Sequence, residues 1–270
     1  MNKLLKKMMV ALLSLGLAQA VLADNMPNFQ KTLQAAKQGN VDAQYNLGVM
    51  YAIGQDVPQD DAQAVQWYRQ AAEQGDAQAQ SNLGLMYEQG QGVRQDYAEA
   101  FRWYRKAAEQ GLVQAQTDLG NGYAQGQGVR QDYAQAVQWY RKAAEQGYAS
   151  AQVNLGLMYE QGQGVRQDYA QAVQWYRRAA EQGNADAQVN LGLMYANGQG
   201  VRQDYTQAVQ WCRRAAEQGH AGAQFNLGVM YAEGRGVRQD LALAQEWFGK
   251  ACQNGDQDGC DIYRRLKLGY

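Results

Sequence analysis

The side chains that most often perform catalysis are scarce in this sequence. It contains a single histidine, His220, and only 3 cysteines in 270 residues. Beyond residue 23 the serines are Ser81 and Ser150, and neither is followed three residues later by the lysine of a serine-x-x-lysine nucleophile. One histidine and dispersed cysteines provide no zinc ligand set, and no glycine pair leads into the Gly-Lys-Ser/Thr of a phosphate-binding loop. We therefore expect no catalytic residue, no metal site and no cofactor.

A long apolar run is absent after residue 23, and the one at the start is short. Three lysines open the chain: Lys3, Lys6 and Lys7. The apolar segment from Met8 to Ala18 is shorter than the roughly 20 residues of a membrane-spanning helix, and small residues then permit cleavage after Ala20 or Ala23. This layout predicts a secretory signal over residues 1–23, with an uncleaved anchor as the alternative. Since no cysteine lies near the cleavage region, a lipoprotein is excluded, and we expect export to the periplasm or, alternatively, full secretion.

An excess of positive charge is also missing. The chain has 25 Lys and Arg against 26 Asp and Glu, and removal of the three signal lysines leaves 22 against 26, a net charge of −4. Nucleic-acid and anionic-membrane surfaces need basic patches. We therefore expect neither nucleic acid nor, after signal cleavage, a membrane as a partner.

Proline is rare, at 2 residues, whereas glycine is abundant, at 30, and the glycines recur at fixed spacing. Tryptophan has the same period of 36 residues: Trp67, Trp103, Trp139, Trp175, Trp211 and Trp247. Two columns of glycine keep this interval: Gly48, Gly84, Gly120, Gly156, Gly192 and Gly228, and then Gly54, Gly90, Gly126, Gly162, Gly198 and Gly234. Six units in register indicate a repeat architecture instead of a closed globule.

Each unit reads as two helices, here termed helix A and helix B, as residues 75–110 illustrate. Asp76 begins helix A, which ends at Gly90, and Asp96 begins helix B as its N-cap. Gly84 lies in the middle of helix A, where glycine costs about 1 kcal/mol. Its recurrence in every unit predicts that the backbone of a neighbouring helix approaches closely there.

A single hairpin of this kind cannot cover its own apolar side, so the units must stack. We expect six repeats between two capping helices, with a polar terminal face. The predicted boundaries are 1–23 for the signal, 24–38 for the N-terminal cap, 39–74, 75–110, 111–146, 147–182, 183–218 and 219–254 for the repeats, and 255–270 for the C-terminal cap.

Three strings carry a resemblance to a known family: Leu83-Gly84-Leu85-Met86-Tyr87, Gly90-Gln91-Gly92-Val93-Arg94-Gln95-Asp96, and Trp103-Tyr104-Arg105-Lys106-Ala107-Ala108-Glu109-Gln110-Gly111. They resemble the Sel-one-like repeat, a branch of the tetratricopeptide-like solenoids, over about residues 39–254. The resemblance implies an all-α fold, a right-handed α/α superhelix of helix–turn–helix repeats. It also implies a concave face lined mainly by A helices and a role in protein–protein contacts.

The cysteines are interpreted through the same resemblance. Cys252 and Cys260 are eight residues apart on successive helices, the interval that cysteine-rich members of the family bridge. In an oxidising compartment this implies a disulfide, with two free thiols as the alternative. Cys212 replaces a helix B tyrosine and is expected to be a small buried residue.

Two further expectations concern single positions. In the third unit Asn121-Gly122 replaces two apolar residues, which predicts either a notch or flexible point, or simply a degraded repeat. His220 stands where other units carry Asp, Leu, Tyr or Asn, a tolerance that predicts a solvated surface residue.

Columns that differ between repeats are the natural place to seek a binding site, because stacking does not fix them. Three such columns of helix A are spaced i, i+4 and i+7 and so share a helix face. From these columns we select the following partner-binding candidates: Tyr45, Ser81, Glu88, Thr117, Asn121, Val153, Glu160, Val189 and Phe225.

Together these features predict an exported, monomeric, non-enzymatic scaffold or adaptor that binds a peptide or domain of another protein on the concave helix A face. One alternative is an envelope carbohydrate or small-ligand binder that uses the many aromatic residues. The other is an enzyme directed at peptidoglycan or β-lactams.

Overall fold

A computed structural model describes residues 29–268, which contain α-helices and no strand. The predicted signal peptide lies outside these residues. The chain divides into two compact units, Met1–Asp96 and Tyr97–Tyr270, which we describe separately. Within each unit consecutive helices pack against each other, so the predicted all-α solenoid of helix–turn–helix repeats is confirmed.

The first unit contains four described helices: α3 (Phe29–Lys37), α4 (Val41–Ile53), α5 (Asp61–Glu73) and α6 (Ala77–Gln89). α3 lies within the range expected for the N-terminal cap and packs on α4. The α4–α5 pair forms the first repeat, and α6 is the helix A that follows it.

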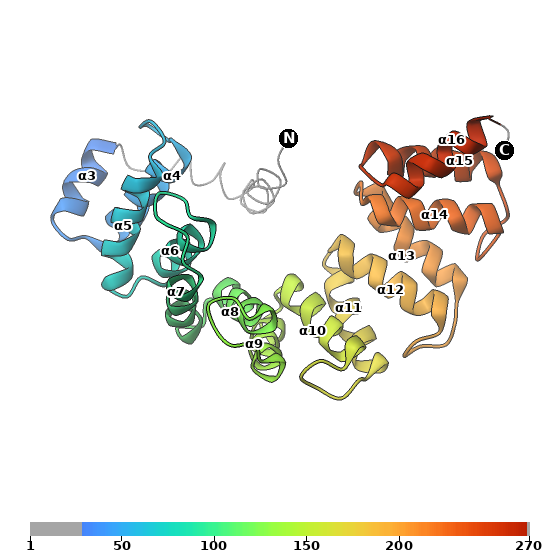
Figure 1. The fold of residues 1–270 in the computed structure, drawn as a ribbon, viewed down its shortest axis with the longest axis horizontal. Coiled ribbons are helices and arrows are strands. Elements are labelled where there is room, and N and C mark those ends of the chain that lie inside the picture. The colour runs from blue at the N-terminus through green and yellow to red at the C-terminus, as the bar shows by residue number, and fades with distance from the viewer. Residues whose placement is uncertain (1–28, 269–270) are drawn as a thin grey trace. The chain divides into compact units, whose positions relative to one another are not determined.

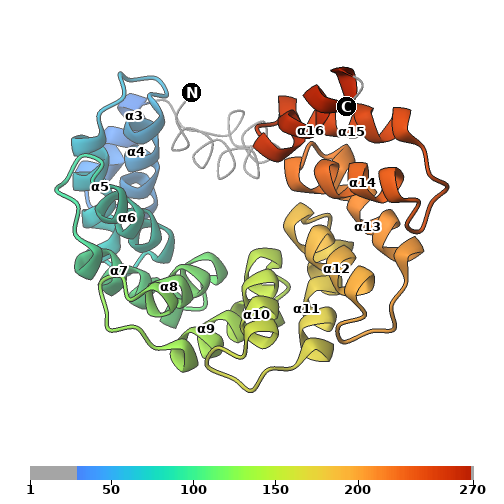
Figure 2. The same ribbon diagram turned by 45° about the vertical axis from the view of Figure 1, so that its right-hand side comes forward.

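The second unit contains α7 (Tyr97–Glu109), α8 (Val113–Gln125), α9 (Tyr133–Glu145), α10 (Ala149–Gln161), α11 (Tyr169–Glu181), α12 (Ala185–Asn197), α13 (Tyr205–Glu217), α14 (Ala221–Glu233), α15 (Leu241–Gln253) and α16 (Gln257–Leu268). Its A helices are α8, α10, α12 and α14, and each packs on the helix B that follows (Figure 1). Within this unit the helices follow a curved path (Figure 2), and α10 and α12 lie nearer its inner side than α9 and α11.

Aspartate and glycine define the helix ends, as expected from the sequence. The Asp132 carboxylate accepts a hydrogen bond from the Gln135 amide at the start of α9, at 3.0 Å. Gly126 ends α8 in the left-handed conformation, with φ of 69°. There a residue with a side chain would be strained, which explains glycine at this position in every repeat.

The mid-helix glycines face an aromatic side chain, not the helix backbone that we predicted. A Cβ atom on Gly156 would lie 2.6 Å from the ring of Tyr176, and one on Gly120 would lie 2.6 Å from Tyr140. The prediction of a close approach is thus correct, but the approaching group comes from the helix B of the same repeat. In the fifth repeat Cys212 takes the place of this tyrosine and lies against Gly192.

The second glycine of each loop has a separate role, which the sequence did not reveal. Gly164 has φ of +69°, and a Cβ atom on it would lie 2.3 Å from the carbonyl of Tyr133, the first residue of α9. The loops with this glycine (Gly92, Gly128, Gly164, Gly200 and Gly236) therefore stack on the start of the preceding helix B, whereas the first loop has Asp56 at this position. Leu241, at the start of the last helix B, is not covered in this way and is 57% exposed.

A buried glutamine on each helix A joins successive repeats. Gln152 donates from Nε2 to the carbonyl of Ala144 on the preceding helix B, at 3.1 Å, and its Oε1 accepts from Gln182, at 2.8 Å. Both ends of the amide are thus satisfied, as burial requires. The same arrangement recurs at Gln116, Gln188 and Gln224.

The third repeat contains no notch at Gly122. The ring of Phe101, on the preceding helix B, occupies this space, because a Cβ atom on Gly122 would lie 2.9 Å from Phe101 Cδ2. Other repeats pair the smaller Val137 with the larger Met158 at the equivalent positions, and both belong to one buried cluster. The third repeat therefore has no packing defect at this point: the larger Phe101 fills the space left by the smaller Gly122.

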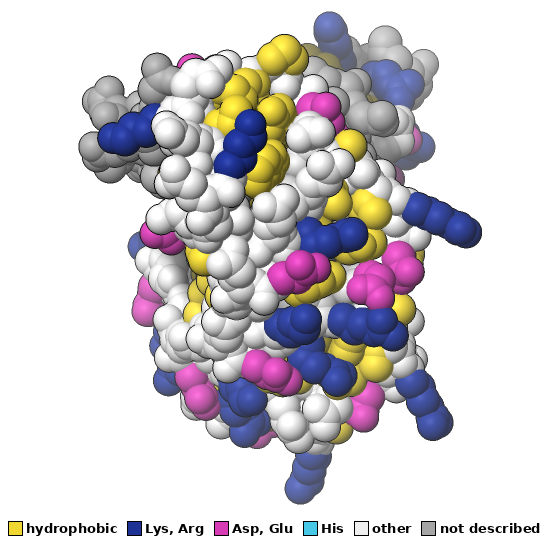
Figure 3. Space-filling view, turned by 90° about the vertical axis from the view of Figure 1, so that its left-hand side faces the viewer, with side chains coloured by type: hydrophobic (Ala, Val, Ile, Leu, Met, Phe, Trp, Pro, Cys, Tyr) yellow, Lys and Arg dark blue, Asp and Glu magenta, His cyan; other side chains and the backbone are white. Residues whose placement is uncertain are grey.

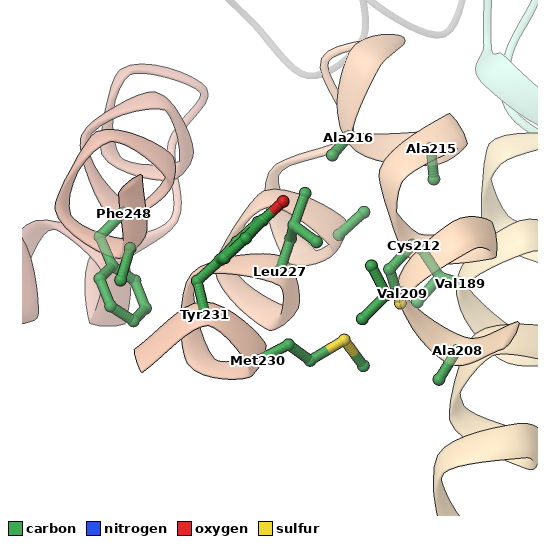
Figure 4. Packing of buried hydrophobic residues seen from close by; sticks show 12 residues of the cluster. Val189, Ala208, Val209, Cys212, Ala215, Ala216, Leu227, Met230, Tyr231 and Phe248 are labelled. Atoms are coloured by element: carbon green, nitrogen blue, oxygen red, sulfur yellow. The ribbon is translucent and has the colours of Figure 1, made fainter. Parts of the chain in front are cut away.

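The core of the fifth and sixth repeats shows how the helices interlock (Figure 4). Val189 of α12, Cys212 of α13 and Leu227 of α14 belong to one buried cluster. Burial raises the pKa of the Cys212 thiol to about 12, so Cys212 is a buried apolar residue in this core. Cys252 and Cys260 form a disulfide between α15 and α16, with their Cα atoms 4.4 Å apart.

Candidate interaction surface

The first of the three variable columns is packed inside the protein, so the proposed stripe is wrong in this part. Four of its members are buried: Ser81, Thr117, Val153 and Val189. The other two, Tyr45 and Phe225, are half-buried.

Members of this column contact residues of helix B. Val153 lies in a buried cluster with Tyr176, and Val189 lies in one with Cys212. The rings of Phe225 and Phe248 are 5.6 Å apart, and those of Tyr45 and Tyr68 are 6.0 Å apart. Members of this column therefore pack against the helix B that follows, which places them in the core and not on a recognition surface.

Two polar members of the other columns also have internal partners. Asn121 accepts a hydrogen bond from the hydroxyl of Tyr140, at 2.8 Å, and Glu160 accepts one from the hydroxyl of Tyr176. Burial raises the pKa of the Tyr176 phenol, and the Glu160 carboxylate raises it further. Glu88, the remaining candidate, is half-buried and uses its backbone carbonyl to accept from Gln95, at 2.7 Å.

The surface that the A helices do expose lies beside these columns. It comprises the second, sixth, ninth and thirteenth residue of each helix, which share one side at helical spacing, and none of these residues is buried in the second unit. We call the following set the helix A face: Gln114, Asp118, Asn121 and Gln125 of α8, Ser150, Asn154, Leu157 and Gln161 of α10, Asp186, Asn190, Leu193 and Asn197 of α12, and Gly222, Asn226, Val229 and Glu233 of α14.

The centre of this face combines amide groups with apolar side chains. Asn154 of α10 donates to Asn121 of α8, at 3.2 Å, so the central parts of these two successive A helices are neighbours. The side chains of Asn190 and Asn226 form no hydrogen bond within the described part of the chain, although both are half-buried. One turn further on lie Leu157, Leu193 and Val229, and Leu193 is 39% exposed.

The sequence analysis missed this amide row because it searched for variation. The column reads Asn46, Asn82, Asp118, Asn154, Asn190 and Asn226. Such near-identity resembles a position fixed by packing. The usable signal was different: asparagine is a poor helix former, so its presence in the middle of every helix A except one needed an explanation beyond stacking.

The cationic side chains of helix B lie elsewhere. Arg141 donates to the hydroxyl of Tyr159 on the next helix A, at 2.6 Å, and Arg177 donates to Tyr195, at 2.7 Å. The tyrosine hydroxyl of the next helix A is thus the partner of both arginines. On the face shown in Figure 3, Lys and Arg side chains are interspersed with Asp and Glu.

Five tryptophans, from Trp103 onward in the repeats, have a cationic side chain of their own helix over the ring. The Lys142 ammonium lies 3.9 Å from the centre of the Trp139 ring, and the Arg178 guanidinium lies 4.5 Å from that of Trp175. Each cation is one turn beyond its tryptophan and shields it. These tryptophan rings are therefore partly covered by the protein's own cations.

His220 is more structured than a solvated residue. It is the N-cap of α14, and its Nδ1 accepts a hydrogen bond from the Ala223 amide, at 3.1 Å. Its Nε2 lies 3.1 Å from the Asp186 carboxylate on α12. Asp186 raises the pKa of His220, and the same hydrogen bond lowers the pKa of Asp186.

Metal-binding side chains are not clustered in the described residues. Among them no three His, Cys, Asp or Glu side chains converge as a metal site would require. Within the same range no helix is long and apolar enough to cross a membrane.

Comparison with known proteins places this geometry in a family. The Sel1 repeat matches six times in succession, at residues 41–76, 77–112, 113–148, 149–184, 185–220 and 221–256. These segments begin two residues later than the repeats that we defined from the sequence. None of the curated proteins matches the chain.

Solved structures give the same result. The c5321 protein of uropathogenic Escherichia coli, described as a protective antigen with an SLR fold, has 45% identity and a TM-score of 0.80 over 87% of this chain. This chain spans 50% of that protein's length. A Sel1 repeat protein from Oxalobacter formigenes has 36% identity and a TM-score of 0.75, with 84% of this chain and 97% of that one covered. The chain belongs to the Sel1 repeat family.

Proposed function

We propose that this chain is an exported, non-enzymatic scaffold that binds an extended segment of a partner protein on the helix A face of its second unit. The observation that carries the proposal is the amide row of Asn154, Asn190 and Asn226 beside the apolar row of Leu157, Leu193 and Val229. Both rows are accessible, and the amides of Asn190 and Asn226 form no hydrogen bond among the described residues. A surface with these properties can bind a partner that has both hydrogen-bonding groups and apolar side chains.

The chemistry of the rows favours a polypeptide. An asparagine amide offers both a donor and an acceptor, which matches the peptide unit. Packed helices are separated by about 10 Å, and an extended chain advances by about 3.3 Å per residue. One asparagine for each helix A therefore meets a peptide unit about every third residue, and side chains between these contacts can reach the apolar row.

Export is supported by two independent features. Residues 1–23 have the layout of a secretory signal. The Cys252–Cys260 disulfide is a feature of proteins from oxidising compartments. The similarity to a protein described as a protective antigen agrees with this location.

The family membership favours a binding role over catalysis, because solenoid repeats present extended surfaces to partners. Incubation of the purified protein with peptidoglycan fragments and with β-lactams is expected to yield no turnover. Product formation that depends on the protein would contradict the non-enzymatic part of the proposal.

Site-specific cross-linking tests the location of the binding face. A photoreactive residue at Leu193 on the face is compared with one at Gln174, an exposed position of α11, in cells that export the full chain. We expect one discrete adduct at Leu193, absent at Gln174, and lost when Asn190→Ala and Asn226→Ala are added. The same adducts at both positions, or an adduct indifferent to the two asparagines, would contradict the proposal.

A further inference from the structure

A hollow lies beside α13, a helix B of the second unit. Its volume is about 380 Å³, which is within the range of small binding sites, about 300–1,000 Å³. Val209, which is buried, and Val237, which is half-buried, provide its apolar floor. The remaining lining residues are exposed, and with the two valines they define the α13 hollow: Thr206, Gln210, Arg213, Arg214, Glu217 and Gly236.

The two arginines of the α13 hollow are held in place by uncharged aromatic groups. Arg213 donates a hydrogen bond to the hydroxyl of Tyr231 on α14, and its guanidinium lies 6.0 Å from the centre of that ring. The Arg214 guanidinium lies 4.4 Å from the centre of the Trp211 ring on its own helix. Contacts of this kind orient a guanidinium group and leave its positive charge in place.

The hollow has an excess of positive charge. Its lining contains two guanidinium groups and one carboxylate, that of Glu217. Within the described residues, none of these three groups forms an ion pair. A guanidinium group has five N–H donors, so Arg213 keeps donors for an anion after its bond to Tyr231. Two neighbouring groups of this kind favour a carboxylate, which accepts from both.

The α13 hollow and the helix A face lie on different sides of α14. Tyr231, which accepts the hydrogen bond from Arg213, follows Val229 of the face by two residues. Two residues correspond to about 200° round a helix. A partner in the hollow therefore does not compete for the surface that the face offers.

The contacts of the arginines are repeated on α11, but the hollow beside α13 has one additional polar group. Arg177 donates to Tyr195, and Arg178 lies over the Trp175 ring. Thr206 of α13, however, stands where α11 has Ala170. The hollow beside α13 thus offers a hydroxyl group next to its arginines.

From this charge complementarity we infer that the α13 hollow binds an acidic segment of a second partner protein. A carboxylate of the segment binds Arg213 and Arg214, and an apolar side chain beside it packs on Val209 and Val237. A polypeptide fits better than an anionic polysaccharide, which has charge but no apolar side chain to cover the two valines. The inference goes beyond the proposed function and does not rest on it, and the chain would join two proteins on opposite sides of α14.

The test selects peptides from a random eight-residue library on the full exported chain and on matched variants. Arg213→Gln with Arg214→Gln removes charge from the hollow. Arg265→Gln with Lys267→Gln removes the same charge from exposed positions of α16. Thr206→Trp fills the hollow and keeps both arginines. Thermal unfolding verifies that each variant is folded.

We expect the chain to enrich peptides with an acidic residue beside an apolar one. Their affinity is expected to fall about two- to fivefold for each arginine replaced in the hollow, to fall in Thr206→Trp as well, and to stay unchanged in the α16 control. No enrichment of acidic peptides, or equal losses in the hollow and control variants, overturns the inference. It is also overturned if heparin, an anionic polysaccharide, binds as tightly and with the same dependence on the two arginines, because the site would then recognise charge alone.

Asn190→Ala with Asn226→Ala distinguishes the two surfaces. This double variant is expected to bind the acidic peptides as the wild-type chain does, because both asparagines belong to the helix A face. Loss of the acidic peptides in this variant would place them on that face and overturn the inference, while the proposed function stands. Failure of the Leu193 cross-link with retained binding in the hollow would contradict the proposed function alone.

Discussion

The hydroxyl of Tyr176 on α11 donates a hydrogen bond to the Glu160 carboxylate on α10. Tyr140, the equivalent residue one repeat earlier, donates instead to Asn121. Phe248, two repeats later, has no hydroxyl, and Ala232 stands at the position equivalent to Glu160. In these three repeats hydroxyl and acceptor are thus present or absent together.

Replacing one member of this pair is expected to cost more than replacing both. Glu160→Ala leaves the hydroxyl of the fully buried Tyr176 without its acceptor, at a cost of about 1–3 kcal/mol. Tyr176→Phe added to Glu160→Ala recreates the Phe248 and Ala232 combination, and the double variant should recover about 1 kcal/mol. Urea denaturation of the two single variants and the double variant measures the coupling. Additive changes in the free energy of unfolding would show that Glu160 and Tyr176 do not interact.

His220 is expected to make stability depend on pH. Because Asp186 raises its pKa above the ordinary value of 6.5, the folded protein holds this proton more tightly than the unfolded chain. The stabilisation is fully present below pH 6.5 and is lost as the pH rises through the folded pKa. It should be below about 1 kcal/mol, because the pair is partly exposed.

Asn184 provides the matched control for this effect, since its side chain caps α12 at the position equivalent to His220. His220→Asn should keep the cap and remove the pH dependence between pH 5.5 and 8.5, as measured by thermal unfolding. The opposite slope in the wild-type protein would mean that the cap bond from the Ala223 amide to a neutral ring outweighs the attraction of Asp186.

Alanine substitutions at two glycines with positive φ distinguish the effect of backbone strain from that of a steric clash. Gly183 has φ of +91° and nothing within 4 Å of an added Cβ, whereas Gly164 has φ of +69° and the Tyr133 carbonyl in the way. Gly183→Ala is therefore expected to cost about 1 kcal/mol from backbone strain alone. Gly164→Ala should lower the free energy of unfolding by at least about twice as much, because the new Cβ atom would force the loop away from the start of α9. Equal losses on urea denaturation would refute the stacking role of Gly164.

The sequence predicted the fold well because its strongest constraints are local and repeated six times. Asp132 and Gly126 define helix ends through bonds within a few residues, and the period of Trp67 and its equivalents defines the repeat. The candidate binding site was predicted less well. Variation in the column of Val189 was interpreted as recognition, yet Val189 is buried in one cluster with Cys212 of the neighbouring helix. A sequence without the geometry does not show which residues face each other, so matched packing and free surface look alike.

The exchange between Phe101 and Gly122 gives the sharpest test of matched packing. Gly122→Met restores the side chain of the other repeats but collides with the Phe101 ring, whose Cδ2 would be 2.9 Å from the new Cβ, and overpacking of this kind costs about 1–3 kcal/mol. Phe101→Val alone leaves a cavity and is expected to lower stability by a similar amount or more. The double variant recreates the Val137 and Met158 pair of the next repeat, so it should be within about 1 kcal/mol of wild type on urea denaturation. If the double variant loses the sum of the two single losses, the third repeat differs for a reason other than the volume shared by these two residues.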